Sequence, residues 1–235
     1  WGIAGSCANV KNLAVDTGVL TFWVDPRNAN GPHVYVQHLD RQTGEALLSP
    51  NGVPVDLTIE GEQSNYRILA DGSGGAYVLI EAGSDGAQQA WLTRINAAGE
   101  PLWDAAQPVT PGFNTESGLE HQKLTKLILS GDQVIVAWSG VDTDYADFLA
   151  EVSMQAFSPA GEPLWGDDGL RITATDLIHE KINDIVAGAD GGVWILWESG
   201  DWSDTDVLCQ YVSATGELSF DIAGLALGEG LGNQS

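Results

Sequence analysis

The stretch INAAGEPLWD at residues 95–104 joins a short apolar run to a glycine turn and a Pro-Leu-Trp sequence, and it returns as FSPAGEPLWG at residues 157–166. A Gly-Glu pair recurs at intervals of 55, 62 and 55 residues: Gly44-Glu45, Gly99-Glu100, Gly161-Glu162 and Gly216-Glu217. A nearly constant period of this length indicates repeated structural units that stack on one another. The sequence therefore predicts four copies of one unit.

Each unit is predicted to contain four short strands. A run in which polar and apolar residues partly alternate precedes each Gly-Glu pair, as in VYVQHLD and AWLTRIN. Before that run comes another that is rich in β-branched and aromatic residues, such as VLTFW and VIVAW, which is typical of a strand buried on both faces. Turns of Gly and Asp separate the runs, and a weaker strand lies at each end of the unit.

Four such units predict an all-β fold, a β-propeller built of four four-stranded antiparallel blades. A two-sheet sandwich has a similar number of strands but does not explain the period. The chain is either a complete four-bladed ring or a section of a larger propeller. Residues 1–11 are expected to form the outer strand of a preceding or closing blade, and residues 229–235 a Gly-rich tail. The blades are expected at 12–58, 59–110, 111–174 and 175–228.

An aromatic or apolar residue follows each Gly-Glu pair, and it is expected to hold the outer strand against the next blade. Trp103 and Trp165 occupy this slot in two blades, and Leu48 and Phe220 occupy it in the other two. Glu81 interrupts a second pattern, because the other three blades have Trp at the end of the second strand. This difference indicates either a special interface at the second blade or simple drift of the sequence.

The motif of Asp190-Gly191-Gly192 with Trp197, followed by Gln210 and Gly216, resembles the degenerate propeller blades of large secreted or surface-attached bacterial proteins. Gln155 with the segment 161–165 carries the same pattern. The resemblance spans nearly the whole chain and concerns structure, since such blades serve many activities and share no catalytic residue. It implies a propeller that is extracellular or lies at the cell surface.

The charge of the chain limits its partners. There are 33 acidic and 9 basic residues, which gives a net charge of −24. Nucleic acids and anionic lipids are therefore not expected as partners, because binding them requires clusters of Lys and Arg. No apolar run is long enough to insert into a membrane as a helix.

The two cysteines allow two interpretations. Cys209 lies in an apolar strand position, which predicts a buried and inert thiol. Alternatively, Cys7 and Cys209 form a disulfide between the N-terminal strand and the last blade, which an extracellular setting would permit.

The long loops are expected to form the binding face. In a propeller, the loops between blades and those between the second and third strands emerge on one side, and here they are long and acidic. Alternating aspartates in two of these loops are candidate calcium ligands, because Ca²⁺ prefers oxygen donors. The alternative is a solvated acidic loop. The candidates are Asp142, Asp144 and Asp147 in one loop and Asp201, Asp204 and Asp206 in the other.

Four further residues are candidates for ligand contacts. Trp202 and Tyr145 lie in the same loops, where an aromatic ring could stack on a sugar or dock in a partner, although a loop Trp can also fold back on its own blade. His121 and His179 occupy matching places before their blades, which fits either ligand binding or a repeated packing role. No GxSxG, HExxH or P-loop motif is present, and no spacing singles out a catalytic pair of carboxylates.

We therefore expect a non-catalytic extracellular propeller module for adhesion, assembly or ligand binding. Its acidic loop face would bind a protein or a glycan, and its blade edges could pair with another copy. We predict no catalytic residue, and calcium is the one candidate cofactor. The alternative is the propeller portion of a secreted hydrolase or lyase that acts on polysaccharide. Convergent carboxylates of raised pKa in a cleft on the loop face would favour that alternative.

Overall fold

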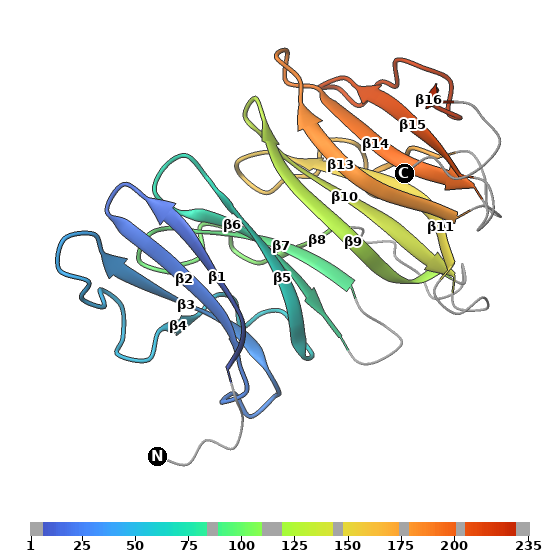
Figure 1. Cartoon of the computed structure of the whole chain (residues 1–235). Helices are drawn as coiled ribbons and strands as arrows, with labels where there is room; N and C mark the ends of the chain where they lie inside the picture. The colour runs from blue at the N-terminus through green and yellow to red at the C-terminus, as the bar shows by residue number, and fades with distance from the viewer. Residues whose placement is uncertain are drawn as a thin grey trace. The chain divides into compact units, whose positions relative to one another are not determined.

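The computed structural model describes residues 7–83, 89–109, 119–142, 148–173, 179–200 and 205–228. The chain forms two compact units, unit 1 from Trp1 to Val109 and unit 2 from Thr110 to Ser235. Within the described ranges the regular elements are all strands, and they form four antiparallel four-stranded sheets (Figure 1). In each sheet the spatial order of the strands follows the chain, so each sheet is one contiguous blade.

Unit 1 contains the first two blades. The first blade consists of β1 (Ala8–Val15), β2 (Gly18–Asp25), β3 (His33–Asp40) and β4 (Val53–Pro54). The second consists of β5 (Gln63–Ala70), β6 (Ala76–Ala82), β7 (Gln89–Ile95) and β8 (Gln107–Pro108). Ala8–Lys11, which the sequence analysis assigned to a separate outer strand, form the start of β1 and pair with β2 in the structure.

Unit 2 contains the other two blades. The third blade consists of β9 (Leu119–Ser130), β10 (Gln133–Asp142), β11 (Phe148–Phe157) and β12 (Leu170–Arg171). The fourth consists of β13 (His179–Ala187), β14 (Val193–Gly200), β15 (Thr205–Val212) and β16 (Leu225–Gly228). These four sheets confirm the predicted all-β fold of four-stranded antiparallel propeller blades.

Each unit buries its core between two neighbouring blades. In unit 1, Phe22 and Val36 of the first blade belong to the same buried cluster as Tyr66 and Ile80 of the second. In unit 2, a second cluster joins Met154 of the third blade to residues of the fourth. A single blade is too thin to bury both of its faces, so each blade depends on its neighbour for stability.

The recurring glycine turn is where one blade packs on the blade before it. Gly99 has φ +73°, and a Cβ on it would lie 2.7 Å from Val53 and 3.3 Å from Leu48 of the first blade. Gly216 has φ +85°, and its Cβ would lie 2.8 Å from Trp165 of the third blade. The indole Nε1 of Trp165 also donates to the carbonyl of Ala214 at 3.3 Å. Trp165 therefore holds the outer part of its blade against the next blade, as predicted.

A repeated glutamine on the third strand latches the hairpin that follows it. The side-chain Oε1 of Gln155 accepts hydrogen bonds from the backbone N–H groups of Ala156 (3.0 Å) and Trp165 (3.1 Å). Its Nε2 donates to the carbonyl of Gly166 at 2.6 Å. Gln37 and Gln210 make the same kind of contacts in the first and fourth blades.

The substitution Gln155→Met should destabilise unit 2 by about 1–3 kcal/mol, because it leaves buried backbone groups without partners. Urea unfolding followed by tryptophan fluorescence measures the loss. Thr93 occupies the same slot in the second blade, and its buried hydroxyl has no hydrogen-bond partner within the described residues. Thr93→Val should therefore leave stability unchanged or slightly increased. Equal losses in the two variants would show that the glutamine does not act as a latch.

Candidate functional site

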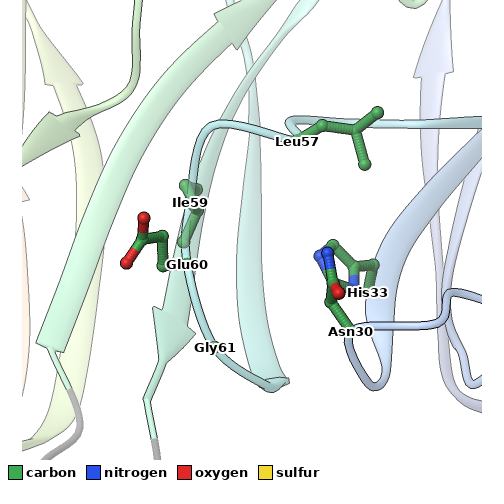
Figure 2. A pocket seen from close by; sticks show the side chains of 6 residues that line it. All are labelled: Asn30, His33, Leu57, Ile59, Glu60 and Gly61. Atoms are coloured by element: carbon green, nitrogen blue, oxygen red, sulfur yellow. The ribbon is translucent and has the colours of Figure 1, made fainter.

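The end of unit 1 that carries its long loops contains a pocket of about 370 Å³. Figure 2 shows its lining, which comes from the β2–β3 loop, the start of β3 and the connection between β4 and β5. The lining residues are Asn30, His33, Leu57, Ile59, Glu60 and Gly61. Two of the long loops that the sequence assigned to the binding face therefore meet at one pocket.

Gln63, the first residue of β5, holds the walls of this pocket together. Its side chain is fully buried, accepting from the Val34 N–H at 2.8 Å and donating to the Asp56 carbonyl at 3.2 Å. Its backbone N–H donates to the Pro32 carbonyl at 2.8 Å. Gln63 does not stand out in the sequence, because it lies in the polar stretch EGEQSN, which has no signal that distinguishes a buried amide from a solvated one.

His33 is the buried titratable side chain of the pocket, with 3% of its surface exposed. Its Nδ1 lies 2.9 Å from the Gly31 carbonyl, which can only accept, so Nδ1 carries a proton and donates. In Figure 2 the carboxylate of Glu60 points away from Asn30 and His33. The pocket thus offers an imidazole and an amide beside the apolar side chains of Leu57 and Ile59, a combination suited to a polar organic ligand.

Asp25, at the end of β2, braces the start of the β2–β3 loop. It accepts hydrogen bonds from the backbone N–H of Arg27 (3.0 Å) and the indole of Trp23 (2.9 Å), and its carboxylate pairs with the Arg27 guanidinium. Burial raises the pKa of Asp25, but the hydrogen bonds from Arg27 and Trp23 outweigh it and hold that pKa well below its usual range. Asp25 is therefore an anion at neutral pH, with a structural role.

A cluster of polar side chains lies where β1 of the first blade meets β5 of the second; we call it the first-strand cluster. The ammonium of Lys11 and the guanidinium of Arg67 both donate to the carbonyl of Tyr66, the latter at 3.2 Å. Lys11 also lies 4.4 Å above the Tyr66 ring. Burial and the neighbouring Arg67 lower the pKa of Lys11, and Glu81 partly offsets this. Burial raises the pKa of Tyr66 to about 12.

Two asparagines complete the first-strand cluster: Asn9 Nδ2 donates to Asn65 Oδ1 at 3.2 Å, and Asn65 Nδ2 donates to Glu81 Oε2 at 3.0 Å. Asn9 has φ 54° and is the one non-glycine residue with positive φ in the described part of the chain. The contact with Asn65 gives a structural role to Glu81, which stands where the other blades have Trp.

The first-strand cluster is built at β-bulges. In every blade the pairing of the first and second strands shifts register beside the Trp slot, which holds Trp23, Glu81, Trp138 or Trp197. Bulges redirect side chains and are common next to active sites. In unit 1 these bulges lie near the end that carries the pocket, since β1 begins and β2 ends there.

The predicted calcium ligands lie mostly outside the described residues, as do Trp202 and Tyr145. This applies to Asp144, Asp147, Asp201 and Asp204. Asp142 ends β10, and Asp206 lies on β15 opposite Ser199. Among the side chains that the structure describes, no group of three or more His, Cys, Asp or Glu could hold a metal ion. The two calcium sites and the aromatic contacts therefore remain predictions.

The two histidines that precede the third and fourth blades in sequence share one register position. His121 pairs with Val141 and His179 with Gly200, in each case three residues beyond the Trp of the second strand. Their side chains lie outside the described part of the structure, so a ligand-binding role remains a prediction.

No helix in the described ranges is long and apolar enough to cross a bilayer.

Neither cysteine forms a disulfide in the structure. Cys209 is buried, as one of the two interpretations predicted, and burial raises the pKa of its thiol. Cys7 is exposed, and its Sγ lies 3.5 Å from Asp25. The alternative bridge would join unit 1 to unit 2, and it remains a prediction that non-reducing mass spectrometry can test.

Comparison with known proteins shows the fold class. No protein-family model matches the chain, and no curated protein matches it. A solved polysaccharide lyase of family PL25, an ulvan lyase bound to -[GlcA(1-4)Rha3S]-, is similar over 88% of this chain, with 10% identity and a TM-score of 0.61. An α-L-arabinofuranosidase from Lactobacillus brevis is similar over 91% of this chain and 75% of its own, with 9% identity and a TM-score of 0.50.

The protein is thus a β-propeller, and it spans 56% of the ulvan lyase chain. Both similar structures are enzymes that act on carbohydrates. This finding contradicts our prediction of a non-catalytic module for adhesion, assembly or ligand binding, and it supports the alternative. The prediction was wrong because the blade pattern reports how strands pack, and packing does not reveal chemistry.

Proposed function

We propose that this chain is the propeller portion of a secreted enzyme that cleaves polysaccharide, either a hydrolase or a lyase. The observation that carries the proposal is the likeness to the ulvan lyase, which extends over 88% of the chain. The partner is then a glycan, and we place it on the loop face of unit 1, over the pocket and the first-strand cluster. An extracellular location belongs to the same proposal. Self-association through blade edges remains a separate prediction.

The pocket of unit 1 supports a lyase more than a hydrolase, because its lining has one imidazole and a single carboxylate, Glu60. Most glycoside hydrolases need a carboxylic acid of raised pKa close to a second carboxylate. Burial raises the pKa of Asp71, but hydrogen bonds from Ser73 and Arg94 outweigh it and the net shift is downward, as it is for Asp25. The pocket instead presents His33, and imidazole is a common general acid or base at neutral pH.

A panel of polysaccharides tests the proposal. We expect the purified chain to depolymerise at least one of them, with release of new reducing ends. A lyase also creates a double bond in the product, which absorbs ultraviolet light, whereas a hydrolase does not. Heat-denatured protein is the control. If the folded chain cleaves no member of a panel of uronate-containing, sulfated and neutral polysaccharides, the proposal is wrong.

On that same substrate, His33→Gln should lower kcat/KM at least about tenfold, as expected when a general acid or base is removed. His38→Gln is the matched control, because His38 is also buried on β3 and bonds to a carbonyl through Nδ1, at 3.0 Å from Ala97. His38 lies near the opposite end of the strand, beside Thr17. Equal loss of activity in both variants would indicate a folding defect and remove the role of His33.

A further inference from the structure

Basic residues are concentrated on the first strands of the blades. The chain has only nine of them against 33 acidic residues, yet all four lysines lie on first strands. Lys11 lies on β1, Lys123 and Lys126 lie on β9, and Lys181 lies on β13. Arg67 adds a fifth positive charge, on β5. A surface that only solubilises the protein would not require this distribution.

Lys11 and Arg67 differ in their partners from four other basic residues. Four basic side chains form ion pairs with carboxylates: Arg27 with Asp25, Arg94 with Asp71, Arg171 with Glu151 and Lys181 with Glu198. Within the described residues, Lys11 and Arg67 form no ion pair, and both instead donate to the same carbonyl of Tyr66. Arg67 also donates to Asn65 Oδ1 at 3.2 Å, and the Glu81 carboxylate acts on Lys11 without forming an ion pair with it. Two like charges that converge on one neutral acceptor repel each other, and a bound anion would relieve that repulsion.

Lys11 and Arg67 are both half-buried, and Lys11 lies on an exposed strand. β1 is an edge strand, and none of its residues is buried. Val10, beside Lys11, exposes 61% of its surface. An ammonium has three N–H donors and a guanidinium has five, so both groups keep donors beyond those used on the Tyr66 carbonyl.

We propose that Lys11 and Arg67 bind a carboxylate or sulfate group of the polysaccharide, so that the substrate is an anionic glycan. Calling this glycan a substrate rests on the proposed function, whereas the binding of the anionic group by Lys11 and Arg67 does not. The remainder of a chain with net charge −24 repels a polyanion, so recognition must come from local charge-assisted hydrogen bonds. Arg67 can meet a carboxylate or sulfate with two parallel N–H donors, and Lys11 adds a point charge beside it.

Binding to three polysaccharides tests this inference, and it distinguishes the two anionic groups. The probes are polygalacturonate (carboxylates), carrageenan (sulfates) and dextran (neutral), measured by calorimetry at low and high salt. We expect the chain to bind one of the anionic probes and not dextran, with affinity that falls as salt rises. Lys11→Met and Arg67→Met should each weaken that binding at least about tenfold, the scale expected when a charge-assisted hydrogen bond is lost.

Arg41→Met is the matched control, since it removes one exposed positive charge from the turn after β3 in the same unit. It should change affinity less than about twofold, as expected for a screened surface charge. Lys11→Arg should retain binding, and this separates a charge requirement from a folding defect. Unchanged binding in both Met variants, or binding to dextran alone, would overturn the inference. A chain that binds the polyanion as expected but cleaves no polysaccharide would refute the proposed function and leave the anion site intact.

Discussion

Replacing Gly216 with alanine is expected to destabilise unit 2 by about 2–5 kcal/mol. Two costs add up at this position. The left-handed backbone conformation, with φ +85°, costs a residue with a side chain about 1–2 kcal/mol. The new Cβ would also lie 2.8 Å from Trp165, and forcing an extra carbon into a packed contact costs about 1–3 kcal/mol. Trp165 cannot move away cheaply, because it is buried and its indole is bonded to Ala214.

Gly44→Ala is the control that separates the two costs. Gly44 occupies the same turn in the first blade with φ +71°, and a Cβ there would meet nothing within 4 Å. It should therefore pay the conformational cost alone, about 1–2 kcal/mol. Urea unfolding of both variants gives the comparison. Equal losses at Gly216 and Gly44 would show that blade-to-blade packing at the glycine turn contributes nothing.

The substitution Asp25→Ala should destabilise unit 1 by about 2–4 kcal/mol. Removing the carboxylate leaves the half-buried indole N–H of Trp23 and the guanidinium of Arg27 without their acceptor. Asp40→Ala is the control, because Asp40 also accepts backbone N–H groups in its turn but is half-buried rather than buried. Its loss should be clearly smaller, and unfolding free energies of the two variants measure the difference.

The stabilising effect of Asp25 should depend on pH. Its pKa in the folded state is lowered from the value of about 3.9 expected in the unfolded chain. Its contribution is therefore fully present above that unfolded pKa, and it is lost as pH falls through the folded pKa. Unfolding free energies measured between neutral and strongly acidic pH should fall less steeply for Asp25→Ala than for the wild type. Parallel pH profiles would contradict the role given to this carboxylate.

The local chemistry of the repeat made the fold predictable. The glycine turns require positive φ, and the alternating runs before them require a strand with one buried face. Both signals lie within about ten consecutive residues. The hairpins at Gly99 and Gly216 can therefore be predicted from the local sequence alone. The loops that meet at the pocket were also predicted, since loop length is read directly from the spacing of strands.

The first-strand cluster could not be predicted in this way. Lys11 and Arg67 are separated by more than fifty residues, and they meet only because β1 packs beside β5. Neither residue belongs to a motif that the sequence reveals. Gln63 could not be predicted for a related reason. Its buried amide joins β3 to a loop, and contacts of this kind leave no periodic pattern in the sequence.

The sequence by itself determined four blades and their turns and long loops, because these features depend on backbone conformation and side-chain alternation between near neighbours. The tertiary structure decided which polar groups come together, because the packing of blades brings distant residues into contact. It is this packing that places two cations, which form no ion pair with any described residue, beside one carbonyl in a strongly acidic chain. The proposal of a carbohydrate-active enzyme rests on neither pattern nor composition, but on the likeness of the fold to an ulvan lyase and an α-L-arabinofuranosidase.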